Sequence, residues 1–260
     1  MSQQANSHPE RQRSPSGAFA LPEAAPAELV LASASPRRHE LLDWLGATFR
    51  VLVTDGEERD DAVPPELVAA LPACPVPLAT HPTLLAWRKA HAACAEAPNS
   101  VIIGADTIVV LDGDVLGKPR DPAHAHAMLR RLAGRTHVVY TGVVLLRPAP
   151  AGTGWLERLQ LELAASSVAI AELADETIAG YIATGEPMDK AGAYGIQGLG
   201  GQLVQSVEGS YTCVVGLPLV TLHTMLVAAG VRGLHDPADA YARWLRAQGK
   251  ETFPCPPTFP

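Results

Sequence analysis

Apolar residues follow two patterns along this chain: short runs of β-branched residues, and longer stretches with apolar residues at helical spacing. The most informative stretch, residues 101–116, reads V-I-I-G-A-D-T-I-V-V-L-D-G-D-V-L. Its two apolar arms, Val101–Ile103 and Ile108–Leu111, each predict a buried strand. Asp112-Gly113 predicts a tight turn into a short second strand at Val115–Leu116.

Asp106 interrupts the apolar pattern between the two arms. A carboxylate inside a buried strand is costly unless it is paired with a cation or bound to a metal, so Asp106 is a candidate functional residue. The plainer alternative is a turn or edge-strand residue with a local hydrogen bond. Gly104, two residues earlier, indicates a bulge or the close approach of another backbone segment.

The remaining pattern divides the chain into further strands and helices. We expect strands at 28–32, 49–53, 137–147, 161–170 and 202–207, and helices at 36–45, 84–96, 123–133, 175–184, 217–229 and 237–248, with a turn at 208–211. Strands and helices alternate, while the Asp-Gly hairpin adds antiparallel pairing. The fold class predicted is α/β with a mixed sheet.

The first helix carries a candidate anion site at its start. Ser35 stands at the predicted N-cap and Pro36 at the first helical position, with Arg37 and Arg38 in the first turn. Free N–H groups beside two guanidinium groups favour an anion, and phosphate is the usual one. The alternative is that both arginines simply point into solvent.

Three other segments draw attention. The acidic run at residues 55–61 usually means a solvated loop, but it could hold a divalent metal if one member faces Asp106. Residues 63–82 are rich in Pro and Ala and read as an insertion. Residues 186–198 are dense in turn formers and polar groups, and glycine-rich loops let backbone amides approach a ligand. A surface connection without a ligand remains the alternative there.

Composition narrows the function classes. The net charge of −7 and pI of about 5.7 argue against a nucleic-acid coat or a polybasic membrane contact, so an anionic ligand would need a local basic pocket. Four scattered cysteines without a C-x-x-C pair fit a reducing cytoplasm with neither a disulfide framework nor a zinc site. Residues 1–27 lack an apolar core and are expected to form a disordered leader.

Three separated blocks together resemble one family. They are 31–42 (L-A-S-A-S-P-R-R-H-E-L-L), 104–110 (G-A-D-T-I-V-V) with G-K-P at 117–119, and 185–198 (G-E-P-M-D-K-A-G-A-Y-G-I-Q-G) with V-V-G-L-P at 214–218. In this order the chain resembles the Maf proteins, house-cleaning nucleoside triphosphate pyrophosphatases, from about Leu29 to Ala229. We therefore expect a leader at 1–27, a catalytic domain at 28–230, and a C-terminal helix with a Pro-rich tail at 231–260.

The resemblance implies an elongated α/β fold of two lobes with the nucleotide in a central cleft, like that of the inosine triphosphate pyrophosphatases. It implies that water and a nucleoside triphosphate give the monophosphate and pyrophosphate, with a divalent metal, Mg²⁺ or Mn²⁺. By motif match Asp106 corresponds to the proton acceptor. Arg37, Thr107 and Gln197 match positions of the branch that acts on dTTP and UTP; a related branch acts on 7-methyl-GTP. Glu58 is the best match to a metal-proximal glutamate, and Glu57 the second.

The residues themselves fit such a reaction. Attack at the α-phosphorus needs an activated water, charge neutralisation and a stabilised leaving group. We expect Asp106 to act as base or metal bridge, with Glu58 as a metal ligand. The candidates to bind phosphate or the base are Ser35, Arg37, Arg38, Lys89, Lys118, Lys190, Thr107 and Gln197. Each lysine could instead be an ordinary surface cation, and Asp189 could orient Lys190.

Two rival functions use the same cleft. One is a nucleotide-binding regulator of cell division or septum formation, in which binding rather than cleavage matters. The other is an enzyme of the same fold that acts on purine analogues or a modified guanine nucleotide. The family and the base rate of two-fold dimers also make a homodimer plausible, with no nucleic-acid or membrane partner.

Overall fold

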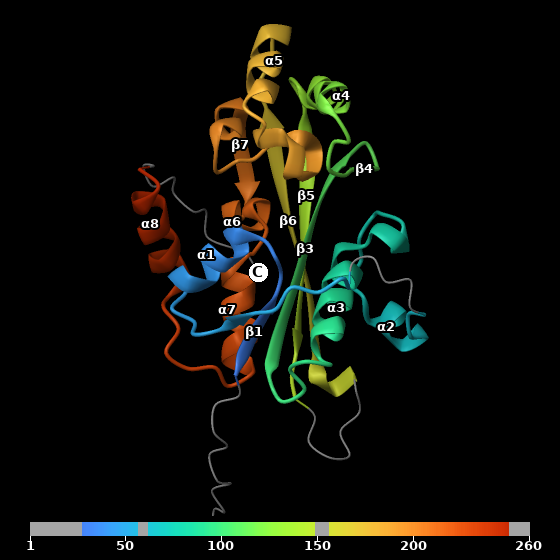
Figure 1. Cartoon of the computed structure of the whole chain (residues 1–260), viewed down its shortest axis with the longest axis vertical. Coiled ribbons are helices and arrows are strands. Elements are labelled where there is room, and N and C mark those ends of the chain that lie inside the picture. Colours follow the sequence, from blue (N-terminus) through green and yellow to red (C-terminus); the bar gives the residue numbers. More distant parts are fainter. Residues whose placement is uncertain (1–27, 57–61, 149–155, 250–260) are drawn as a thin grey trace, which may run out of the picture.

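The structure is a computed structural model that describes residues 28–56, 62–148 and 156–249. The leader expected at 1–27 and the tail at 250–260 lie outside the described residues. The helix that precedes the tail is described. Figure 1 shows an elongated molecule in which long twisted strands run along the main axis.

One mixed sheet organises the fold, as the pattern predicted. Its strand order is β2-β1-β3-β5-β6-β7, with β4 paired to β3. β1 runs parallel to β2 and β3, whereas every other pair is antiparallel. The strands are β1 (Leu29–Ala32), β2 (Arg50–Val51), β3 (Val101–Leu111), β4 (Asp114–Leu116), β5 (Thr136–Leu146), β6 (Leu159–Ile170) and β7 (Val204–Gly209).

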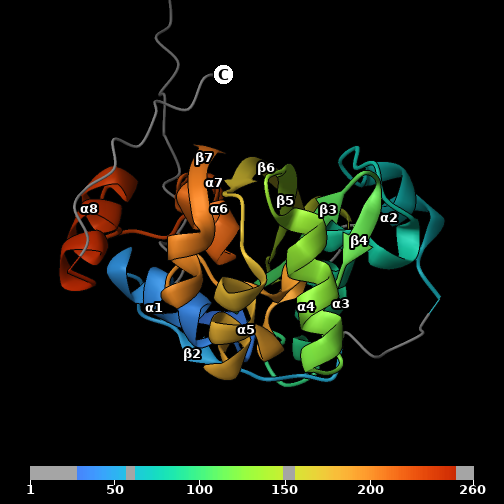
Figure 2. The same ribbon diagram turned by 90° about the horizontal axis from the view of Figure 1, so that it is seen from above.

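Helices cover both faces of this sheet. Figures 1 and 2 show α2 and α3 on one side, and α1, α6, α7 and α8 on the other, with α4 and α5 toward one end of the long strands. Each side has its own apolar cluster. The helices are α1 (Pro36–Trp44), α2 (Pro65–Ala70), α3 (Pro82–Ala93), α4 (Pro122–Leu132), α5 (Asp175–Ala183), α6 (Tyr211–Val215), α7 (Leu219–Ala228) and α8 (Pro237–Ala247).

Prolines and caps set where several helices begin. Proline occupies the first position of α1 and α4, where its missing N–H has no helical partner to lose. The Asp121 side chain accepts a hydrogen bond of 2.7 Å from the His124 amide and caps α4. Ser35 stands at the N-cap of α1 as predicted, although its side chain makes no capping hydrogen bond.

The prediction of two separate strand arms around Asp106 is wrong, because β3 is one continuous strand. β5 pairs with it from Ile102 to Val110, and this partner keeps the backbone extended through the polar positions. The close approach indicated by Gly104 is confirmed: a Cβ there would collide with the carbonyl of Ala86 in α3. Gly142 of β5 likewise leaves room for the start of α3, so the helix lies directly on the sheet.

Other segments are more ordered than the pattern indicated. The stretch 63–82 contains α2 and a 3₁₀ turn at Leu78–Thr80, and Leu67 is fully buried there. Its origin as an insertion stays a prediction. The turn expected at 208–211 is wrong, because β7 continues to Gly209 and α6 begins at Tyr211. In the described ranges, no helix is long and apolar enough to cross a membrane.

Candidate active site

The candidate site opens where one edge of β3 loses its neighbours. On that edge β1 pairs with β3 as far as Gly104, and β4 pairs from Val109 onward. The described residues provide no strand partner for 105–108 on this edge, whereas β5 covers the opposite edge throughout. A cavity of about 800 Å³ lies against this gap. Its size is that of a small-molecule site, and its position beyond the carboxyl end of a parallel strand is a usual place for one.

Asp106 lies in this gap and is paired with Lys89 of α3. The Lys89 Nζ donates to Asp106 Oδ1 at 2.8 Å and to the Ala105 carbonyl at 3.2 Å. Both side chains are largely buried, 14% exposed for Asp106 and 7% for Lys89. The buried carboxylate is therefore paired, which excludes the alternative of a turn or edge residue with only a local bond.

Arg38 is committed to a network that holds the first loop to the sheet. Its guanidinium donates to the Gly216 carbonyl at 2.7 Å, to Ser33 Oγ at 3.2 Å and to Thr107 Oγ1 at 3.0 Å. Thr107 Oγ1 also lies 2.9 Å from Thr141 Oγ1 on β5. These contacts fix Thr107 beside Asp106. Both Arg38 and Thr107 still line the cavity, so their predicted contact with a ligand remains a prediction.

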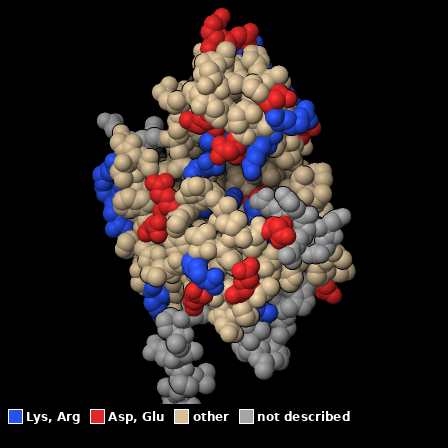
Figure 3. Space-filling model, viewed as in Figure 1, with Lys and Arg blue, Asp and Glu red and all other residues tan. Residues whose placement is uncertain are grey.

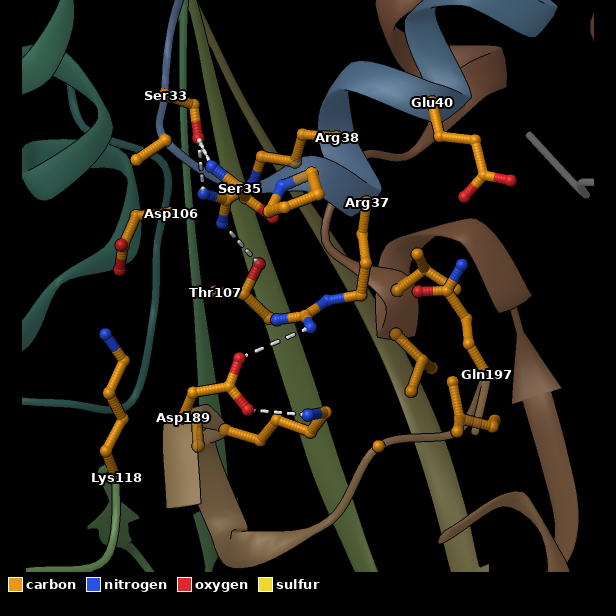
Figure 4. A pocket seen from close by; sticks show the side chains of 18 of the residues that line it. Ser33, Ser35, Arg37, Arg38, Glu40, Asp106, Thr107, Lys118, Asp189 and Gln197 are labelled. Atoms are coloured by element: carbon orange, nitrogen blue, oxygen red, sulfur yellow. Dashed lines mark hydrogen bonds and ion pairs between the residues drawn. The ribbon is translucent and has the colours of Figure 1, made fainter. Parts of the chain in front are cut away.

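Arg37, the neighbour of Arg38 on α1, extends into the cavity toward Asp189, as Figure 4 shows. Its guanidinium lies 3.7 Å from Asp189 Oδ2, and the other Asp189 oxygen accepts from Lys190 Nζ at 2.6 Å. Burial works against the charge on Asp189, but Lys190 and then Arg37 outweigh it and hold the pKa of that carboxyl below its usual value. Asp189 thus orients Lys190, as expected, and also joins Arg37 to the 186–203 segment.

Figure 4 shows Lys118 reaching toward Asp106 on one side of the cavity and Gln197 on the other. Basic and acidic side chains gather around this hollow in the space-filling view (Figure 3). All the described residues predicted to form the site line the one cavity: Ser35, Arg37, Arg38, Lys89, Asp106, Thr107, Lys118, Lys190 and Gln197. A shared cavity between Asp106 and Arg37 is what the nucleotide hypothesis requires.

The predicted metal ligands are only partly visible. Glu58 and its alternative Glu57 lie outside the described residues. Asp55, from the same acidic run, lines the cavity together with Asp106. Within residues 28–56, 62–148 and 156–249, no cluster of three or more His, Cys, Asp or Glu is placed to hold a metal. A divalent metal held by Asp106 and Glu58 therefore stays a prediction.

Sequence reasoning missed several residues of the cavity wall. Glu40 of α1 and Gln248 after α8 both line it, and the Gln248 side-chain amide donates to Glu40 at 2.7 Å. Tyr194 lines it as well, with its hydroxyl 2.8 Å from Nε2 of the buried His137. The apolar spacing of residues 237–248 predicted a helix there. That spacing gave no sign that the end of the helix would reach the cavity.

Comparison with known proteins gives a consistent result. The sequence model of the family described as Maf-like protein matches residues 28–229. A dTTP/UTP pyrophosphatase of Shigella boydii serotype 4 is 47% identical over 199 residues, which cover 76% of this chain and 91% of that protein. One from Moorella thermoacetica is 46% identical over 204 residues, 78% of this chain and 96% of that protein.

Proposed function

The chain belongs to the Maf family, and from this premise we propose that it hydrolyses dTTP and UTP to the nucleoside monophosphate and pyrophosphate. The observation that carries the proposal is that Asp106, Arg37, Lys118 and Lys190 all line one cavity. The similar proteins named dTTP/UTP pyrophosphatase support the choice of substrate.

The reaction begins with water attacking the α-phosphorus. A bond forms between the water oxygen and that phosphorus, and the bond to the bridging oxygen of the β-phosphate breaks, with its electron pair leaving on pyrophosphate. Asp106 takes the role of orienting this water and accepting its proton. The Lys89 contact at 2.8 Å fixes the carboxylate in place for that task.

The cationic residues of the cavity suit the phosphate chain. Lys118 approaches from the end of β4, near Asp106, while Arg37 enters the cavity from the start of α1 (Figure 4). Lys190 lines the same cavity beside Asp189. Charge-assisted hydrogen bonds from such groups stabilise phosphate oxygens and the negative charge that develops on the leaving group. Asp189 would give up part of its contact with Arg37 when a phosphate binds, because the two anions compete for one guanidinium.

Base recognition falls to Gln197, with Thr107 positioning the ligand. A side-chain amide carries both a donor and an acceptor, so Gln197 can match the paired donor and acceptor on the edge of uracil or thymine. Gln197 lies across the cavity from Asp106 (Figure 4). A nucleotide between them could place its base at Gln197 and its α-phosphate at Asp106.

A divalent metal, Mg²⁺ or Mn²⁺, fits the donor set. Asp55 and Asp106 offer carboxylate oxygens in one cavity, and hard cations of this kind take oxygen ligands from carboxylates and substrate phosphates together. Glu58 is proposed as a further ligand on sequence grounds alone. When bound, the metal would neutralise phosphate charge and lower the pKa of a coordinated water.

The proposal also covers the partners, the location and the oligomeric state of the enzyme. A nucleoside triphosphate is the proposed partner, without nucleic acid or membrane. The cysteine usage supports a cytoplasmic location, and a homodimer follows the base rate for soluble proteins.

One experiment tests the proposed function. The full chain is incubated with Mg²⁺ or Mn²⁺ and dTTP, UTP, CTP, dGTP, ITP or 7-methyl-GTP, and pyrophosphate and monophosphate are measured together. We expect dTTP and UTP to be the best substrates. Preference for 7-methyl-GTP or a purine analogue would overturn the substrate assignment, and tight binding without turnover would favour a nucleotide-binding regulator.

A further inference from the structure

The segment Glu186–Leu203 forms much of one cavity wall without a regular helix or strand. It consists of three 3₁₀ turns, Glu186–Asp189, Ala191–Ala193 and Leu199–Leu203. Lys190 and Gln197 line the cavity from this segment. Short 3₁₀ turns have poor hydrogen-bond geometry, so side chains must supply much of what fixes their shape.

The Glu186 carboxylate supplies that support from inside the segment. Its Oε2 accepts from the Leu199 amide at 2.9 Å, and its Oε1 accepts from the Gly200 amide at 3.1 Å. The Tyr181 hydroxyl, at the end of α5, also donates to Oε1 at 2.9 Å. The Tyr181 oxygen in turn accepts from the Gly195 amide at 3.0 Å. The Glu186 and Tyr181 side chains thus accept hydrogen bonds from backbone amides on both sides of Gln197 in the sequence.

Three glycines of the segment are explained by these same side chains. A Cβ at Gly198 would collide with the Glu186 carboxylate, and one at Gly200 with the Tyr181 hydroxyl. A Cβ at Gly195 would collide with the Lys190 side chain. The glycine-rich composition that suggested a ligand-binding loop therefore serves here to let Glu186, Tyr181 and Lys190 fit beneath the turn.

The carboxylate form of Glu186 is the one that suits this arrangement. Burial disfavours its charge, but the hydrogen bonds from Gly200, Leu199 and Tyr181 outweigh burial and keep the pKa of Glu186 below its usual value. All three partners are donors, and an ionised carboxylate is an acceptor at both oxygens.

We propose that Glu186, assisted by Tyr181, is a positioning residue that sets base selectivity by holding the turn that presents Gln197. The inference rests on the proposed function, since it assigns a task within the same cleft. Glu186 itself need not touch the nucleotide: its carboxylate is directed at backbone amides, and its effect reaches the base through the place of Gln197.

Glu186→Gln is the sharpest change because it preserves shape and removes one acceptor. The new NH₂ group would face an N–H or O–H donor where an oxygen now accepts, leaving a donor unpaired in a part-buried site. The turn would shift, and Gln197 with it. The Glu186 carbonyl, which accepts from Lys190 Nζ at 2.7 Å, is unchanged by this substitution.

The test compares base preference and phosphate chemistry in the same variants. For Glu186→Gln we expect the ratio of kcat/KM for UTP over CTP to fall about tenfold through KM for UTP, with kcat within about threefold. Tyr181→Phe should lower the ratio less, because only one amide of the turn, that of Gly195, loses its acceptor. Gln197→Glu serves as the positive control for lost base preference.

Glu176→Gln is the matched control, since Glu176 is an exposed carboxylate in the first turn of α5. An unchanged UTP-to-CTP ratio in Glu186→Gln, with normal folding by circular dichroism, would overturn the inference. Equal loss on UTP and CTP through kcat would also overturn it and leave Glu186 a structural residue. A wild-type chain that does not prefer UTP would instead refute the proposed function, before any variant is compared.

Discussion

The two walls of the cavity are built in opposite ways. On the sheet side, Asp106 and Thr107 lie on the long strand β3, and Lys89 lies on a helix packed directly against it. The Lys89–Asp106 pair is 2.8 Å long and largely buried. On the other side, Arg37 meets Asp189 at 3.7 Å, and these side chains are 33% and 68% exposed.

This difference teaches how the cleft can combine fixed chemistry with adjustable recognition. A buried charge pair between two regular elements has one geometry and is screened little by solvent. A more exposed pair between α1 and a 3₁₀ turn contributes little free energy and can exchange partners when a ligand binds. We infer that the sheet wall fixes the reacting groups. On the 186–203 wall the Arg37–Asp189 contact can exchange partners, while Glu186 and Tyr181 hold the turn itself.

The largest expected effect is at Asp106. Asp106→Asn removes the proton acceptor while keeping the side-chain shape, so pyrophosphate release from UTP should fall at least about 100-fold. Stopped assays with the purified variant and unchanged circular dichroism would check this. Near-normal turnover would remove Asp106 from the mechanism and, with it, the special role of the sheet wall.

Lys89→Met should have the next largest effect, and the quantity it should lower is the free energy of unfolding. Loss of the ammonium leaves the Asp106 carboxylate without its partner, and breaking such a pair is strongly destabilising when both groups are buried. Because Asp106 faces the cavity and is 14% exposed, we expect a loss of about 2 kcal/mol in the free energy of unfolding. Urea titration measures it. Lys118→Met, a cavity lysine near the chain's β-hairpin, is the control and should cost less than about 0.5 kcal/mol.

A pH effect of similar size should come from His137, which contacts Tyr194 of the 186–203 wall. Burial lowers the pKa of His137 from 6.5 to about 4, and its partner Tyr194 belongs to the 186–203 segment. As pH falls below 6.5, the unfolded chain binds a proton that the folded chain refuses, so the free energy of unfolding falls. The expected loss from this group is about 2 kcal/mol between pH 7.5 and 5.

Urea titrations at pH 7.5, 6.5 and 5 measure that slope. His137→Gln should remove this part of the pH dependence. His39→Gln, at an imidazole whose side chain is half exposed, is the matched substitution and should keep the wild-type slope. Identical slopes in the wild type and His137→Gln would contradict the assignment.

The smallest effect is predicted at Asp189, on the exposed pair. Asp189→Asn leaves Arg37 and Lys190 in the cavity but frees them from a competing carboxylate. We expect KM for UTP to change by less than about threefold and the free energy of unfolding by less than about 1 kcal/mol. A loss as large as that of Lys89→Met would show that both walls are equally rigid.

The sheet wall was largely predictable from the sequence. An acid inside an apolar strand has few stable surroundings, so Asp106 could be identified as paired or ligand-binding before its partner was known. Gly104 indicated a bulge or the close approach of another backbone segment, and that segment is α3. The partner itself was not predictable, because Lys89 comes from a helix whose register over the strand depends on Gly104 and Gly142 together.

The other wall was identified only as a dense loop. Its 3₁₀ turns depend on Glu186 and Tyr181 bonding to amides as far away as Gly200, and local propensity does not reveal such contacts. The motif match brought Gln197 into the site, but not Asp189 against Arg37. The continuity of β3 was missed for a related reason: the pairing strand β5, not the sequence around Asp106, keeps it extended.

The central claim is that this cleft directs water to the α-phosphorus of a pyrimidine nucleoside triphosphate. Hydrolysis of UTP by the full chain in ¹⁸O-labelled water, followed by mass spectrometry of both products, tests it most directly. We predict UMP that carries the label and unlabelled pyrophosphate. Label in pyrophosphate, or UDP with orthophosphate as products, would contradict the account.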